Sequence, residues 1–70
     1  MGMARYPTED DYRLAIHLRI TETAARSGWR PEQITKQFAA RQLGISPEMY
    51  MKQNAAFGIS HEDVQNRRVR

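Results

Sequence analysis

Residues 38–50 read FAARQLGISPEMY, and the glycine, serine and proline near its middle separate two segments of helical periodicity. Gly44 stands where a glycine takes up the left-handed conformation that ends a helix. The hydroxyl of Ser46 can cap the next helix, and Pro47 falls in its first turn, where the missing N–H costs no hydrogen bond. Glu48 adds a negative charge that complements the dipole of this second helix. We therefore expect one helix to end just before the glycine and another to begin just after the serine.

The same helix-ending chemistry recurs on both sides of this stretch. Gly28 is followed closely by a proline, and residues 58–62 are a near copy of residues 44–48. We read this as a reused connector between helices, since two short copies do not make a solenoid. The predicted fold is all-α, one domain over residues 8–67, in which three helices form a small bundle with a short fourth helix. The expected helices span residues 8–27, 31–43, 47–57 and 61–67, between a flexible segment 1–7 and a basic tail 68–70 that we also expect to be loose.

The first of these segments has a rival interpretation as a β-strand. Its aliphatic residues Leu14, Ile16, Leu18 and Ile20 occupy alternate positions, which is the periodicity of a strand. Such a strand would suit a ribbon-helix-helix repressor, in which a short arm pairs with its twin across a dimer. Too few residues then remain before Gly28 for the first helix of that fold, so we favour the helix.

As a helix, residues 8–27 carry apolar side chains on two nearly opposite sides. A surface helix of a small bundle needs one such stripe, so the second is expected to contact a partner or a second copy of the chain. The alternative is that the short last helix folds back and covers it. The stripe expected to face the core contains Tyr12, Ile16, Ile20 and Ala24, and the other contains Leu14, Leu18 and Ala25. We predict Leu14 and Leu18 as the partner interface.

Residues 38–50 resemble the helix-turn-helix of phage-repressor (Cro-like) DNA-binding proteins, over about a third of the chain. Ala40 is small where two helices would cross, Leu43 is a core residue, and Ile45 fills the gap between the helices. Tyr50 has the spacing to pack back on the first helix. The resemblance implies a helix-turn-helix at residues 31–57 whose second helix enters a DNA major groove. Gln53 departs from the pattern, which has an apolar residue there.

The charge of the chain agrees with a nucleic-acid partner. Its formal net charge is +3, and residues 12–58 carry seven lysines and arginines against three acidic residues. The resemblance implies that phosphates supply most of the affinity, because no arginine, asparagine or glutamine occupies a base-facing position; only Asn54 lies near that face. The predicted DNA-binding residues are Arg30, Lys36 and Arg41 for the backbone, Ser46, Glu48, Met51 and Lys52 at the groove, and Arg67 and Arg68 in the tail. The leading hypothesis is a dimeric regulator or accessory factor that binds double-stranded DNA.

A protein-interaction module is the competing hypothesis. The helix over residues 47–57 is rich in methionine and aromatic residues, which are common on adaptable binding surfaces as well as in cores. We expect its inward stripe to contain Met49, Tyr50, Ala56 and Phe57, and Met51 to be exposed. With the second stripe of the first helix, this would suit a small adaptor, antagonist or accessory subunit.

Catalytic and metal-binding functions are disfavoured. The chain has no cysteine and two histidines, which lie far apart in the sequence, so we expect no metal site, no cofactor and no enzymatic activity. We expect His17 to be partly buried with one hydrogen bond, and His61 to be exposed. No apolar run approaches the length of a membrane span and no signal peptide is recognisable, so we expect a cytoplasmic protein without a membrane partner.

Overall fold

The computed structural model describes residues 6–69, and within that range it contains helices and turns but no strand. The all-α prediction is therefore confirmed, and the strand interpretation of residues 14–20 is wrong. The elements are α1 (Glu9–Ile16), η1 (His17–Thr21), α2 (Glu22–Ser27), η2 (Pro31–Gln33), α3 (Lys36–Leu43), α4 (Pro47–Phe57) and α5 (His61–Gln65).

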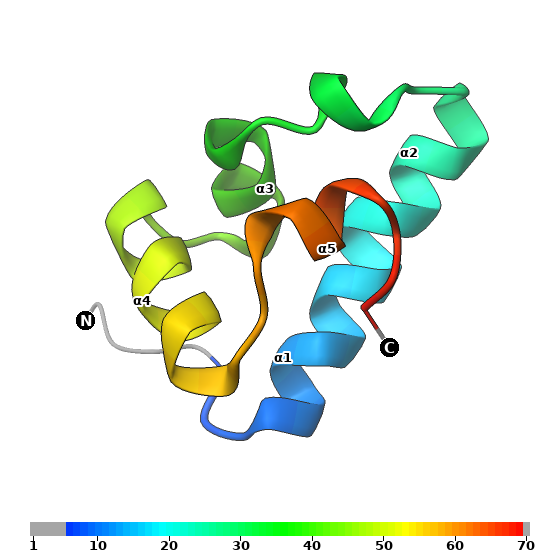
Figure 1. Ribbon diagram of the computed structural model, residues 1–70. Helices are drawn as coiled ribbons and strands as arrows, with labels where there is room; N and C mark the ends of the chain where they lie inside the picture. The colour runs from blue at the N-terminus through cyan, green and yellow to red at the C-terminus, as the bar shows by residue number, and fades with distance from the viewer. Residues whose placement is uncertain (1–5, 70) are drawn as a thin grey trace.

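The first three elements form one continuous long helix (Figure 1). Thr8 caps its start, where the hydroxyl accepts from the backbone N–H of Asp11. Its middle, η1, is a π-helical turn in which the N–H of Glu22 bonds to the carbonyl of His17, five residues earlier. The hydroxyl of Thr21 donates to the same carbonyl at 2.8 Å, and this second bond accompanies the wider turn.

The three predicted glycine helix ends are confirmed. At Gly44 φ is +74°, and the following N–H of Ile45 bonds back to the carbonyl of Ala40 at 3.0 Å, as in a Schellman motif. Gly28 and Gly58 have the same left-handed backbone, and in each case the next residue bonds back to the helix in the same way. Each connector therefore brings an apolar residue back against the helix that has just ended.

Two predicted helix boundaries are wrong. The segment 31–43 is not one helix, because the backbone of Ile34 leaves the helical region (φ −86°, ψ 87°) between η2 and α3. The break buries the Ile34 side chain completely, and Thr35 caps the new start by accepting from the N–H of Phe38. The last helix ends at Gln65 rather than at residue 67, where Arg67 has a φ of +58°.

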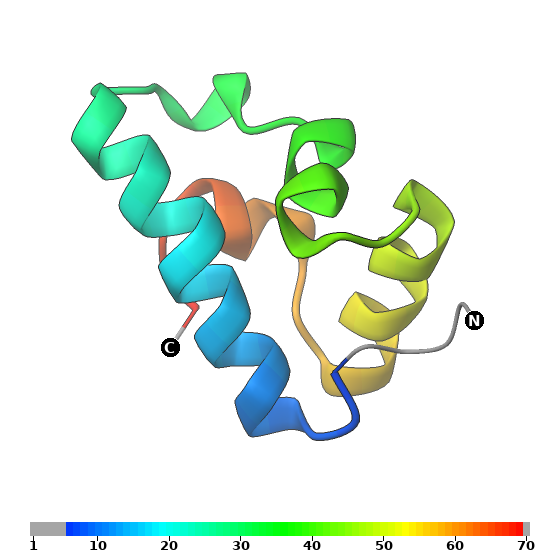
Figure 2. The same cartoon turned by 180° about the vertical axis from the view of Figure 1, so that it is seen from behind.

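Figures 1 and 2 show the long helix on one side and α3 and α4 on the other, with α5 and the C-terminal segment against the long helix. The core lies between them, and its largest fully buried side chains are Tyr12, Tyr50, Ile16, Ile20, Ile34, Leu43, Val64 and Val69. The predicted core stripe of the first helix is thus confirmed.

The two ends of the described chain are packed, which corrects the expectation that they are loose. Tyr6 is half-buried, and its hydroxyl donates to the carbonyl of Leu43 at 2.8 Å. Val69 is buried, and Arg68 donates its backbone N–H to the carbonyl of Asp63. The rest of the expected flexible segments, residues 1–5 and Arg70, lies outside the described residues.

Candidate functional site

The side chains that the sequence analysis assigned to the contact between α3 and α4 do pack between these two helices. Ala40, Leu43 and Tyr50 are buried, and Ile45 is half-buried against the core. The hydroxyl of Ser46 accepts from the N–H of Met49 at 3.0 Å and caps α4 as expected. The inner side of each helix is therefore fixed, and the opposite side of α4 faces solvent.

Two polar residues on the inner side of α4 correct the predicted apolar stripe. Gln53 is buried and donates to the carbonyl of Tyr6 at 3.0 Å, so it ties the N-terminal segment to α4. Asn54 is buried and accepts from the hydroxyl of Tyr12, so its amide is unavailable to a partner outside the fold. Ala56, expected in the inward stripe, is exposed.

The exposed side of α4 carries little charge. Met51 is 43% exposed, as predicted, so a large apolar side chain lies in the middle of this side. The exposed residues of the helix are Pro47, Glu48, Met51, Lys52, Ala55 and Ala56. We call these six residues the α4 face.

The predicted cations of α3 and α4 are exposed and unpaired. Lys36 begins α3, Arg41 lies in its last turn, and Lys52 belongs to the α4 face. Among residues 6–69 none of the three forms an ion pair, whereas Arg13 is paired with Glu9 at 2.7 Å. Within the described chain these three side chains are therefore free to meet an anionic group.

The remaining predicted DNA-binding cations lie elsewhere. Arg30 stands before η2 and is 3.9 Å from the carboxylate of Glu32. Arg68 is 3.3 Å from Asp63, and Arg67 lines a hollow with residues of η1 and α2. Figures 1 and 2 place this C-terminal segment beside the long helix and away from α4. The structure therefore does not bring the two tail arginines together with the α4 face.

The second predicted site is an apolar ridge on α1 and η1. Leu14 and Leu18 are 55% and 48% exposed, so the alternative in which the last helix covers them is wrong.

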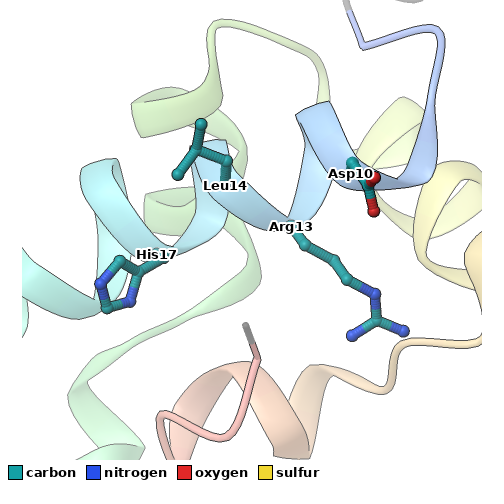
Figure 3. A pocket seen from close by; sticks show the side chains of 4 residues that line it. All are labelled: Asp10, Arg13, Leu14 and His17. Carbon is teal, nitrogen blue, oxygen red and sulfur yellow. The ribbon is translucent and has the colours of Figure 1, made fainter.

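Leu14 lines two hollows in the surface beside this ridge. One, of about 240 Å³, is lined by Asp10, Arg13, Leu14 and His17. In Figure 3 the side chain of Leu14 extends from one edge of the helix, and those of Arg13 and His17 extend from the opposite edge. The other, of about 280 Å³, is lined by Tyr6, Asp11, Leu14, Ala15, Leu18 and Arg19.

His61 joins three elements, which corrects the expectation that it is exposed. Its Nε2 is 3.0 Å from the carbonyl of Ile34, and its Nδ1 is 2.7 Å from the hydroxyl of Tyr50. Because a carbonyl can only accept, Nε2 carries the proton and Nδ1 accepts from the tyrosine. Burial lowers the pKa of His61, against the opposing effect of the Ile34 carbonyl, and the charge of Lys36 lowers it further. The fold therefore stabilises the neutral form of the His61 imidazole.

The buried tyrosines and the other histidine have structural partners. Burial raises the pKa values of Tyr12 and Tyr50, so both phenols stay protonated and act as hydrogen-bond donors. His17 is half-buried, with Nδ1 3.3 Å from the hydroxyl of Thr21. Neither tyrosine nor His17 lies in a cluster of three metal-ligating residues, and residues 6–69 contain no such cluster.

Comparisons with models of known families, with curated proteins and with solved structures give no match for this chain. Within the described part of the chain, no helix has the length and apolar character needed to cross a membrane. The features of this chain that bear on its function are the α4 face with its neighbouring cations and the ridge formed by Leu14 and Leu18.

Proposed function

We propose that this chain is a small DNA-binding protein, a transcriptional regulator or DNA-associated accessory factor that binds duplex DNA through α3 and α4. The observation that carries the proposal is the set of exposed cations Lys36, Arg41 and Lys52 on these two helices, which form no ion pair within residues 6–69. They lie beside α4, which is capped and whose outer side no described residue covers. The resemblance of residues 38–50 to Cro-like proteins also supports the proposal; on this interpretation α3, the connector at residues 44–46 and α4 correspond to the helix-turn-helix.

In this proposal the phosphates supply most of the affinity. Lysine and arginine side chains neutralise phosphates and release condensed counterions, which makes binding strongly dependent on salt. The α4 face contributes Lys52 and the hydroxyl of the neighbouring Ser46, while Glu48 suits the exocyclic amine of cytosine. Since the Asn54 amide is buried, few groups read base edges, and sequence discrimination by one copy is weak. The proposal places this DNA-binding function in the cytoplasm, as expected from the sequence.

Fluorescence anisotropy of a labelled random duplex, titrated with protein at several salt concentrations, tests the proposal. We expect binding in the micromolar range, the usual range for non-specific complexes, and an affinity that falls steeply as salt increases. If the three cations of α3 and α4 each contact a phosphate, the slope of log K against log salt is about −2.7. Absence of binding at low salt would exclude the proposal.

A protein-interaction module is the second candidate, and the exposed Met51 at the centre of the α4 face favours it. Methionine adapts to irregular apolar surfaces, and the alanines beside it leave room for a partner side chain. This candidate predicts no affinity for duplex DNA at any salt concentration. The same titration therefore separates the two functions.

A further inference from the structure

The ridge formed by Leu14 and Leu18 is amphipathic along its length. The hollow beside it has Asp11 at one end and Arg19 at the other, with Leu14, Ala15 and Leu18 between them. The salt bridges within residues 6–69 involve neither of these two charged residues. An occupant of this hollow therefore needs an apolar centre, a cation near Asp11 and an anion near Arg19.

The same ridge turned end for end meets this requirement. When two copies of the helix pack antiparallel about a two-fold axis beside residue 16, Leu14 lies level with Leu18 of the second copy. Arg19 then lies two residues from the level of Asp11 of the second copy, about 3 Å along the axis at the usual helical rise, well within the reach of an arginine side chain. Symmetry forms this ion pair twice.

The parallel arrangement is opposed by the same charges. It would place Asp11 beside Asp11 and Arg19 beside Arg19, and like charges in contact are unfavourable. Arg13, which lies on the flank of the ridge, is already held by Glu9 and points toward the carbonyl of Phe57 at 3.5 Å. It therefore adds little repulsion between antiparallel copies.

The opposite side of this helix is buried, and this keeps the Leu14–Leu18 ridge on the surface. Tyr12, Ile16 and Ile20 are completely buried, so the helix cannot rotate to hide its leucines inside the fold. In a chain of 70 residues without cysteine, a second subunit is also an effective way to bury more apolar surface.

We propose that the Leu14–Leu18 ridge is the contact of an antiparallel, two-fold symmetric homodimer, in which Asp11 of each copy pairs with Arg19 of the other. This inference concerns a different helix from the one that carries the α4 face, and it holds whether or not the protein binds DNA. In the dimer each leucine of one copy lies against the hollow of the other, and the two ion pairs select the antiparallel register.

Sedimentation equilibrium of the full chain, without DNA, over low to high micromolar concentrations tests the dimer. We expect a monomer–dimer equilibrium that Leu14→Asp weakens about ten-fold or more, because it buries an unpaired carboxylate in an apolar contact. Because Leu14 is exposed, helical content measured by circular dichroism stays unchanged. Ala56→Asp, at an exposed alanine of α4, is the matched control and leaves the equilibrium unaltered.

Charge reversal tests the register. Asp11→Arg and Arg19→Asp each place like charges together and weaken the dimer, while the double variant restores opposite charges and recovers most of the affinity. A wild-type chain that is monomeric throughout, or a dimer that survives Leu14→Asp, overturns the proposal. So does a double variant that dimerises no better than the single variants. None of these measurements contains DNA. Failure of the dimer is therefore distinguishable from failure of the proposed DNA binding, which the anisotropy titration measures.

Discussion

The α4 face and the Leu14–Leu18 ridge are both exposed, but they differ in chemistry. The long helix from Glu9 to Ser27 carries four acidic residues and three arginines, while α3 and α4 together carry three cations and a single acid. The ridge is apolar with opposite charges at its ends, and the α4 face has one methionine, one lysine and one glutamate beside a proline and two alanines. A self-complementary surface of this kind suits a second copy of the chain, whereas a surface flanked by cations that form no ion pair within residues 6–69 suits an anionic partner.

The largest expected effect separates the two sides of α1. Ile16→Ala empties a fully buried position and is expected to lower the free energy of unfolding by about 2–5 kcal/mol. Leu14→Ala, two residues away on the exposed side, is expected to change it by less than about 0.5 kcal/mol. Urea unfolding followed by circular dichroism, at dilution that keeps the protein monomeric, measures both. Equal losses at the two positions would contradict the described orientation of the helix.

The next effect concerns the connector that presents α4. Gly44→Val forces a β-branched residue to a φ of +74° and is expected to cost about 1–3 kcal/mol of stability. Gly44→Asn is the matched control, because asparagine tolerates the left-handed conformation, and its cost is smaller. If valine were as stable as glycine at this position, the tight turn between α3 and α4 would be wrong.

A smaller effect tests whether the charge difference between the two faces matters for DNA. Lys52→Ala removes one phosphate contact and is expected to weaken duplex binding several-fold while reducing the salt slope by about 0.9. Arg26→Ala, at an exposed arginine of α2, is expected to leave both quantities unchanged. Anisotropy titrations of the two variants at matched salt concentrations provide the measurement. A similar loss in both variants would show binding without a preferred face.

The smallest effect is a pH dependence at the contact between α5 and α4. Because the pKa of folded His61 lies below its ordinary value of 6.5, protonation favours the unfolded chain. Its contribution to stability is present above about pH 6.5 and is lost as the pH falls through the lowered, folded pKa. His61→Gln keeps a donor for the Ile34 carbonyl but does not titrate, so its loss of stability from pH 7 to pH 5 is expected to be smaller than that of the wild type. Urea unfolding at the two pH values compares them, and equal losses would contradict the role of His61.

Local chemistry made much of the fold predictable. The glycine ends at Gly28, Gly44 and Gly58 and the caps at Ser46 and Ser60 depend on hydrogen bonds within a few residues, so their patterns are visible in the sequence. The two stripes of the first helix were also predictable, because helical periodicity assigns faces without knowledge of the neighbours. Neither kind of signal shows whether a distant part of the chain also covers the second stripe.

Residues whose partners lie far along the chain were predicted poorly. His61 was expected to be exposed because it lies in the first turn of a helix, yet it is half-buried and bonds to Ile34 and Tyr50. Gln53 looked like a defect in an apolar stripe and Asn54 was expected near the base-facing side, but they bond to Tyr6 and Tyr12 inside the fold. One signal could have found the two amides, since buried aromatic hydroxyls and carbonyls need hydrogen-bond partners.

The sequence by itself determined the all-α class, the helix ends at glycines and the amphipathic first helix, because these follow from backbone conformation and hydrogen bonds between near neighbours. Only the tertiary structure decided that the break at Ile34 buries this side chain, that Val69 packs into the core, and that Leu14 and Leu18 remain uncovered. These outcomes depend on which surfaces of distant segments pack together in the folded chain. Such packing leaves no pattern in the local sequence, because the partners lie far apart along the chain.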